Sequence, residues 1–166
     1  CSHEIATFAV GLLGDLREDE TPPRTVRSGP PVELFRFTDH GACVAFLTDT
    51  LNQLALDEPL ASIALLTASR ELSDLYFRGL RSSEVSRLRQ VTQQDFTFAP
   101  GVEVTEVEQV KGLEFDYVIL ADVSVTHWPD TPGSRRVLHV GATRAIHQLW
   151  LVSVGSPSPI IAGALT

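Results

Sequence analysis

Short apolar runs recur along this chain, and segments with helical spacing separate most of them. The clearest runs are Ile63–Leu66, Tyr117–Ala121 and Leu149–Val154. Short continuous apolar runs are typical of strands that are buried on both faces of a parallel sheet. Because strands alternate with helices from one end of the chain to the other, the sequence predicts an α/β fold with a mostly parallel sheet.

Spacing and capping residues predict the individual elements. Asp39 and Ser134 are expected to cap helices, since a side-chain oxygen before an apolar periodic segment can accept from the first free backbone N–H groups. Charged or Pro/Gly-rich composition predicts loops at 17–31 and 128–134. The expected helices are 2–16, 40–54, 69–80, 134–147 and a short one starting at Pro157 or Ser158; the expected strands are 32–37, 63–66, 85–91, 102–110, 117–121 and 149–154.

Composition limits the class of protein. The chain has 166 residues, 43% of them hydrophobic and 20% charged, which is typical of one globular domain. Cys1 and Cys43 are too few for a disulfide framework, so we expect two free thiols in a cytoplasmic protein. No apolar run approaches the roughly 20 residues of a membrane helix. Met is absent, so we expect a piece of a longer chain.

The formal net charge is −8. An acidic domain gains little from neutralising phosphates, so strong binding to nucleic acid would need a local basic patch or another domain. Arg78, Arg81, Arg87 and Arg89 form the one basic cluster. It could follow a phosphate backbone, although a solvated face is the simpler interpretation. The five histidines show no metal-ligand spacing, so no metal site is expected.

The first string with chemical content is Val110–Asp116, which precedes the run at Tyr117. Gly112 permits a positive φ or a close backbone approach at a turn. In a nucleotide site, an amide near such a glycine can meet a phosphate, and the carboxylate of Glu114 can accept from ribose hydroxyls. The alternative is a glycine turn whose charged neighbours are solvated.

The second string is Val140–Ala145, which we expect on the helix 134–147. Leu138, Gly141, Ala142 and Ala145 would form its buried face. Arg144 would lie on the flank of that face, where a rigidly held arginine can stabilise the charge of phosphoryl transfer. The alternative is a surface arginine that covers the helix with its aliphatic stem.

Together the two strings resemble motifs V and VI of superfamily 1 helicases of the UvrD/Rep/PcrA type. Lys111–Asp116 is similar to motif V, and Val140–Ala145 is similar to motif VI, usually Tyr-Val-Ala-x-Thr-Arg-Ala. Cys1–Ile5 resembles the tail of motif IV. The resemblance spans most of the chain. It implies a RecA-like three-layer αβα fold, similar to that of P-loop NTPases but without the P-loop.

The resemblance implies that residues 1–166 form a single domain, the second motor domain (2A) of an ATP-dependent DNA helicase. ATP with Mg²⁺ would lie between it and an N-terminal RecA-like domain of the same chain. That partner domain would carry the phosphate loop, since no Gly-x-x-x-x-Gly-Lys-Ser/Thr string occurs here. This piece alone is therefore expected to be inactive, with DNA binding left to the full-length protein.

The resemblance also implies roles for particular residues. Arg144 would be the arginine finger that reaches the γ-phosphate. Glu114 would contact the ribose, and Gly112 would allow close approach of the nucleotide. Gln109 and Lys111 would lie along the segment that joins the ATP site to the nucleic-acid groove, and Thr143 is a further candidate there.

Two departures from the family pattern leave alternatives open. Glu106 and Glu108 stand where relatives have a Thr and a His that touch the DNA backbone. Only about 35–40 residues separate the strand at Ile63 from motif V, too few for an inserted 2B domain. Both features look closer to HelD-like proteins, which bind RNA polymerase. The alternative function is therefore a HelD-like polymerase-binding ATPase domain, and a third is an unrelated α/β regulatory domain.

Overall fold

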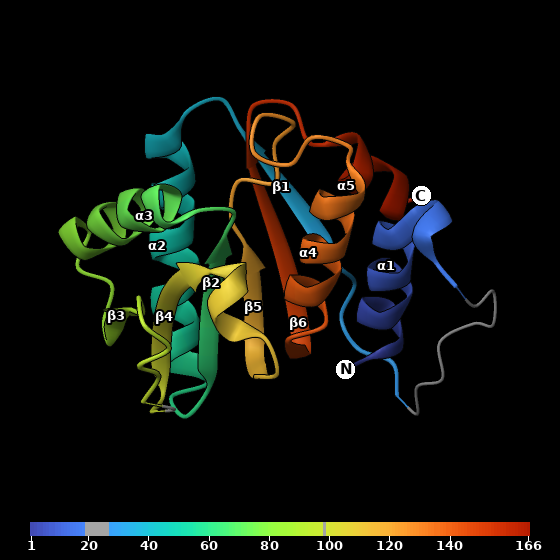
Figure 1. The fold of residues 1–166 in the computed structure, drawn as a ribbon. Helices are drawn as coiled ribbons and strands as arrows, with labels where there is room; N and C mark the ends of the chain where they lie inside the picture. Colours follow the sequence, from blue (N-terminus) through green and yellow to red (C-terminus); the bar gives the residue numbers. More distant parts are fainter. Residues whose placement is uncertain (19–26, 98) are drawn as a thin grey trace.

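A six-stranded, all-parallel sheet organises the molecule (Figure 1). The computed structural model describes residues 1–18, 27–97 and 99–166. The strand order is β1-β6-β5-β2-β4-β3, so the predicted α/β class with a parallel sheet is confirmed. The strands are β1 (Glu33–Phe37), β2 (Ser62–Thr67), β3 (Leu88–Gln90), β4 (Gly101–Glu106), β5 (Phe115–Leu120) and β6 (Ala145–Val154).

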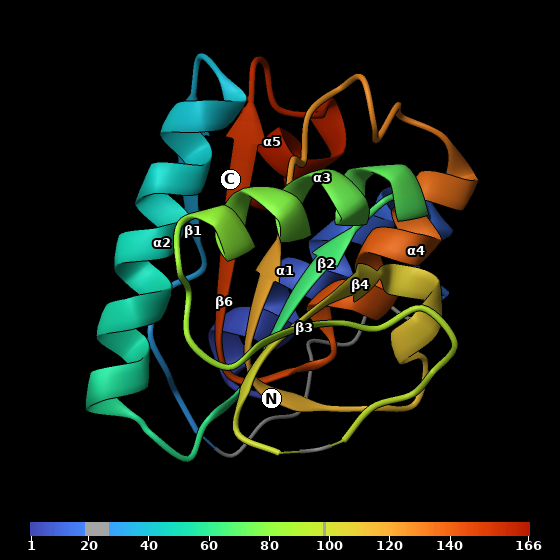
Figure 2. The same cartoon turned by 90° about the vertical axis from the view of Figure 1, so that its left-hand side faces the viewer.

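Helices cover both faces of the sheet and complete three layers, as Figures 1 and 2 show. One hydrophobic core lies between the sheet and α1, α4 and α5, and a second lies between the sheet and α2 and α3. The central strand β2 contributes to both, since Ile63 and Leu65 face one core while Ala64 and Leu66 face the other. The helices are α1 (His3–Leu13), α2 (His40–Asp57), α3 (Arg70–Ser82), α4 (Pro132–Ala142) and α5 (Pro159–Ala164), with short 3₁₀ turns η1 (Gly14–Leu16) and η2 (Val107–Val110).

A side-chain oxygen caps the start of each α-helix. Such a cap satisfies one of the free N–H groups of the first turn and stabilises a helix by about 1 kcal/mol. The cap at Asp39 confirms the prediction made there. The acceptors and donors are Ser2 with Ile5 (3.3 Å), Asp39 with Ala42 (2.8 Å), Ser69 with Leu72 (3.2 Å), Thr131 with Ser134 (3.1 Å) and Ser158 with Ile160 (3.2 Å).

The predicted helix 134–147 is wrong at both ends. Thr131 rather than Ser134 is the cap, and α4 ends at Ala142. Thr143 and Arg144 form a turn, so Arg144 does not lie on the helix, and Ala145 begins β6. The reason is tertiary: the first residues after the turn pair with β5, and this ladder outweighs the helical spacing of the apolar residues.

Two predicted strands are shorter than expected. The segment 102–110 leaves the sheet after Glu106 and closes into η2, where Val107 and Val110 are buried under α4. The segment 85–91 keeps only Leu88–Gln90 as strand. Arg87, just before it, has φ +51°, a left-handed conformation that interrupts extended structure. The predicted loop 17–31 lies partly outside the described residues, because 19–26 are not described.

The two thiols differ sharply in environment. Cys1 is exposed, whereas Cys43 on α2 is fully buried and lies 3.7 Å from the Tyr76 hydroxyl. Burial raises the pKa of the Cys43 thiol to about 11. We expect iodoacetamide at pH 8 to alkylate Cys1 rapidly and Cys43 only after unfolding, because only the thiolate reacts. Peptide mapping after alkylation with and without denaturant checks this, and rapid labelling of Cys43 in the native protein would contradict it.

Among the described residues, no helix combines the length and the apolar composition that crossing a membrane requires.

Candidate functional site

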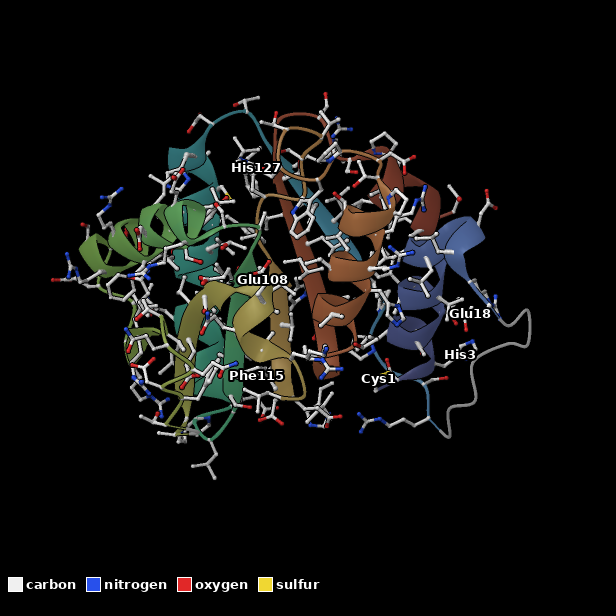
Figure 3. All side chains as sticks on the ribbon, in the orientation of Figure 1. Cys1, His3, Glu18, Glu108, Phe115 and His127 are labelled. Atoms are coloured by element: carbon white, nitrogen blue, oxygen red, sulfur yellow. The ribbon has the colours of Figure 1, made fainter. Side chains whose placement is uncertain are left out.

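The two sequence motifs meet at one edge of the sheet. The backbone N–H of Phe115 donates to the carbonyl of Arg144 (2.8 Å), and Phe115 pairs with Ala145 in the β5–β6 ladder. Glu114 and Arg144 therefore lie on neighbouring chain segments although they are far apart in sequence. Figure 3 places Phe115 at this edge, level with Cys1 and opposite His127.

This edge is formed by the amino ends of the parallel strands. In open α/β sheets, ligands usually bind outside the carboxyl ends of the strands. This candidate site lies at the amino ends instead, because η2 and the turn after it carry the chain from the carboxyl end of β4 back to the amino end of β5. Glu106 and Glu108 lie near one end of this crossover, and Glu114 lies at the other.

Gly112 forms the turn that enters β5. Its φ of +84° lies in the left-handed region, which favours glycine. A Cβ at this position would meet nothing within 4 Å, so the space beside the backbone is open. Lys111 and Glu114, on either side of the turn, are both exposed. The segment therefore exposes the backbone of Gly112 and the carboxylate of Glu114 to solvent at this edge of the sheet.

Arg144 extends from the turn between α4 and β6 and folds back over the end of α4. Its Nε donates to the carbonyl of Val140 (3.2 Å), and its Nη2 donates to Oγ1 of Thr143 (3.1 Å). The Thr143 hydroxyl in turn donates to the same Val140 carbonyl (2.9 Å). A cation at a helix carboxyl end is favourable, because the free carbonyls there carry partial negative charge.

The charge of Arg144 is not neutralised by a carboxylate. Within the described part of the chain, Arg144 forms no ion pair, and its guanidinium bonds only to neutral oxygens. The side chain is half-buried. A half-buried guanidinium without a counter-ion is suited to bind an external anion, and its planar fork fits the oxygens of a phosphate.

Gln109 is tied to its own neighbourhood. Its Oε1 accepts from the backbone N–H of Gln94 (2.9 Å), and its Nε2 donates to Glu106 (3.3 Å). One carboxylate oxygen of Glu106 is buried without a hydrogen-bond partner, and Glu108 is exposed. The carboxyl-end portion of the crossover therefore carries negative charge where a phosphate backbone would be repelled.

The amino-terminal residues lie beside the same edge. A Cβ added to Gly29 would lie 2.9 Å from the Cβ of Ser2 and 3.5 Å from the carbonyl oxygen of His147, so Gly29 fits between these two segments. The carboxylate of Glu4 also accepts from the Gly29 N–H (2.8 Å). The segment resembling the tail of motif IV is thus close to the start of β6, near the turn that carries Arg144.

Asp116 has a structural role that sequence reasoning missed. Its Oδ2 accepts from the backbone N–H (2.9 Å) and hydroxyl (3.2 Å) of Ser62, on the neighbouring strand β2. Its Oδ1 lies 3.5 Å from Nε2 of His147. The sequence separation of 54 residues from Ser62 left no local signal for this contact.

The basic cluster does not form one phosphate-binding face. Arg87 donates to a backbone carbonyl (2.8 Å), and Arg89 pairs with the buried Glu103 (3.3 Å). Burial raises the pKa of Glu103, and the charge of Arg89 opposes this shift. Arg78 and Arg81 remain exposed on α3. Within residues 1–18, 27–97 and 99–166, no group of His, Cys, Asp and Glu is arranged to hold a metal ion.

The segment that contains both motifs matches a known protein family. Residues 101–152 match the family model of the UvrD-like helicase C-terminal domain. The resemblance to UvrD-like helicases is confirmed. The match runs from β4 into β6, so both motifs, with Gly112, Glu114 and Arg144, lie inside it. The HelD-like subgroup stays a prediction, and none of the curated proteins matches the chain.

Solved structures support the fold. The C-terminal domain of a possible DNA helicase from Lactobacillus plantarum WCFS1 superposes with a TM-score of 0.80 at 24% identity, covering 97% of this chain and 90% of that one. This agreement confirms the three-layer α/β fold, which is consistent with the predicted RecA-like type. The UvsW helicase from bacteriophage T4 is more distant, with a TM-score of 0.47 at 10% identity over 71% of this chain and 45% of that one.

Proposed function

We propose that this chain is the second motor domain of an ATP-dependent superfamily 1 DNA helicase or translocase. It would supply motifs V and VI to an ATP site shared with an N-terminal RecA-like domain of a longer chain, and it would lack a 2B insertion. The observation that carries the proposal is the Phe115–Arg144 backbone bond, which brings both motifs to one edge. The family match over residues 101–152 supports the same function.

The residues at this edge suit a nucleotide. Arg144 would stabilise negative charge on the γ-phosphate, and Glu114 would accept from a ribose hydroxyl. The open backbone at Gly112 would let the nucleotide approach closely. ATP bound with Mg²⁺ would supply the phosphoryl group, with the magnesium carboxylates on the other domain. The residues present fit this role, because in the described part of the chain no carboxylate pairs with Arg144.

Coupling between the nucleotide and the DNA groove would run through the crossover that joins β4 to β5. Gln109 and Lys111 lie between Glu106 and the turn at Gly112, so they would connect the DNA groove to the nucleotide. Thr143 would contribute by holding the guanidinium of Arg144. A movement of this segment on ATP binding would therefore reach both sites.

A HelD-like RNA polymerase-binding ATPase domain is the second candidate. One observation favours it: Glu106 and Glu108 place carboxylates where a helicase would contact DNA phosphates, and one oxygen of Glu106 is buried without a partner. Co-purification of the full-length protein with RNA polymerase, together with no duplex unwinding, would support this candidate over the first.

Replacing Glu114 by alanine in the full-length protein tests the ribose contact. A hydrogen bond to a carboxylate contributes about 1.5 kcal/mol, so we expect the KM for ATP to rise roughly tenfold while kcat changes little. Steady-state kinetics with ATP and 2′-deoxy-ATP measures this, because the variant should also lose any preference for the ribonucleotide. Glu108→Ala, an exposed carboxylate near the other end of the crossover, is the control. Equal KM values for Glu114→Ala and the wild type would count against the assignment.

A further inference from the structure

A groove opens on the opposite face of the sheet from α4. It lies between α2 and the strands β5 and β6 and has a volume of about 650 Å³. Figure 2 shows this face, with α2 along one side of the sheet and α3 crossing it. The residues that matter for its chemistry are Phe46, Asp49, Asp57, Glu58, Tyr117 and Trp150.

Aromatic rings form the apolar part of the groove. Tyr117 and Trp150 are stacked, with ring centroids 5.8 Å apart and planes at 12°. Both side chains are partly exposed. Rings with accessible faces attract cations through the negative charge of their π-systems, and an arginine can also stack on them.

Carboxylates provide the polar part. Asp49, Asp57 and Glu58 line the groove, and its lining includes no Lys or Arg. The carboxylate of Asp57 accepts from the neutral side-chain amide of Gln53 (3.0 Å). Burial, followed by the charge of Glu58, raises the pKa of Tyr117, so its hydroxyl keeps its proton beside that carboxylate. The groove is therefore a negatively charged aromatic surface without a cation of its own.

Two of these carboxylates lie where helix electrostatics disfavour them. Asp57 is the last residue of α2, and Glu58 follows it. A negative charge at the carboxyl end of a helix is destabilising by about 0.3–1 kcal/mol, because the helix dipole is negative there. The helix dipole therefore does not stabilise these two carboxylates, and a cation from outside the groove would.

The groove continues past Glu58 and Tyr117 into a second hollow of about 360 Å³, which Leu60, Asp116 and His147 also line. Asp116 lies 3.5 Å from Nε2 of His147, so its charge is already partnered there. Leu60 is 82% exposed. The combined surface therefore offers an apolar contact at Leu60 and the carboxylates of the groove. A nucleic-acid strand fits less well, since its phosphates would face these carboxylates.

We propose that this surface, the acidic–aromatic groove, docks an extended protein segment rich in arginine or lysine. One basic side chain stacks on Tyr117 and Trp150 and pairs with Asp49 and Asp57, and an adjacent apolar side chain covers Leu60. The aromatic part of this surface lies on the face of the sheet opposite α4, and only Asp116 in the second hollow comes near the ATP edge. The proposal therefore does not depend on the proposed function.

Fluorescence anisotropy of a labelled Arg-Leu-Arg-Leu-Arg peptide, titrated with the full-length protein, tests this directly. We expect saturable binding that weakens as salt rises, because exposed charge pairs are screened. The double variant Asp49→Asn/Asp57→Asn should bind at least roughly tenfold more weakly. Glu33→Gln/Glu71→Gln removes two exposed charges outside the groove and should bind like the wild type.

Weaker peptide binding by the double variant can be distinguished from a loss of fold by measuring thermal stability. Asp57→Asn removes an unfavourable charge from the end of α2, so its thermal midpoint should be no lower than that of the wild type. Wild-type peptide affinity in the double variant would overturn the proposal. So would equal binding of a Glu-Leu-Glu-Leu-Glu peptide, or occupation of the groove by a second copy of the chain in sedimentation experiments.

Discussion

Replacing Arg144 by alanine in the full-length protein is expected to lower kcat for ATP hydrolysis by roughly 10³-fold or more. The structure gives the reason why the loss would be specific. Among the described residues, the guanidinium bonds only to Val140 and Thr143 at the end of the preceding helix α4, so removing it leaves no buried carboxylate there unpaired. The effect on folding should therefore be small, and the effect on turnover large.

Two further variants make this experiment decisive. Arg136, exposed on α4, is a matched control, and Arg136→Ala should keep wild-type turnover. Arg144→Lys keeps the charge but loses the planar fork, so its kcat should lie between those of the wild type and Arg144→Ala. Single-turnover kinetics separates the chemical step from product release. Near-normal turnover in Arg144→Ala would refute the finger role of this residue.

Replacing Gly141 by valine is expected to destabilise the domain by about 1–3 kcal/mol, because it overpacks a filled core. A Cβ at Gly141 would lie 3.0 Å from Cδ2 of Leu120 and 3.5 Å from Cγ1 of Val107, and valine adds two more methyl groups. The glycine thus lets α4 pack closely on β5 and η2. Because α4 ends two residues before Arg144, this packing also helps to fix the main-chain position of Arg144.

Gly163→Val provides the comparison. Gly163 lies on α5, and a Cβ there would meet nothing within 4 Å, so the same substitution should leave the free energy of unfolding nearly unchanged. Chemical denaturation of the two variants beside the wild type measures the difference. Equal free energies of unfolding for the two variants would contradict this prediction, because they would show that the core under α4 can rearrange to accommodate valine.

Local signals in the sequence predicted most of the elements but not where they end. The cap at Asp39 could be predicted because its carboxylate oxygen accepts from a backbone N–H only three residues along the chain. The end of α4 depends on the pairing of Ala145 with Phe115, a contact between segments 30 residues apart (145 − 115 = 30). Helical spacing of apolar residues continued past this point, so the sequence overestimated the helix.

The candidate site was predicted in its residues but not in its orientation. Gly112, Glu114 and Arg144 were found through the resemblance of two short strings, and the structure brings those strings together. Their position at the amino ends of β5 and β6 depends on strand order, which no local pattern specifies. The acidic–aromatic groove gave no sequence signal for the same reason, since Asp57 and Trp150 meet only after α2 packs over β6.

The backbone hydrogen bond between Phe115 and Arg144 fixes the main chain of Arg144 but not its side chain. The main chain continues into the β5–β6 ladder, so its position is set by strand pairing rather than by side-chain packing. The guanidinium is held by two hydrogen bonds to neutral oxygens, and breaking both costs about 1–3 kcal/mol. An anion at this edge can therefore reorient the guanidinium without any movement of the main chain.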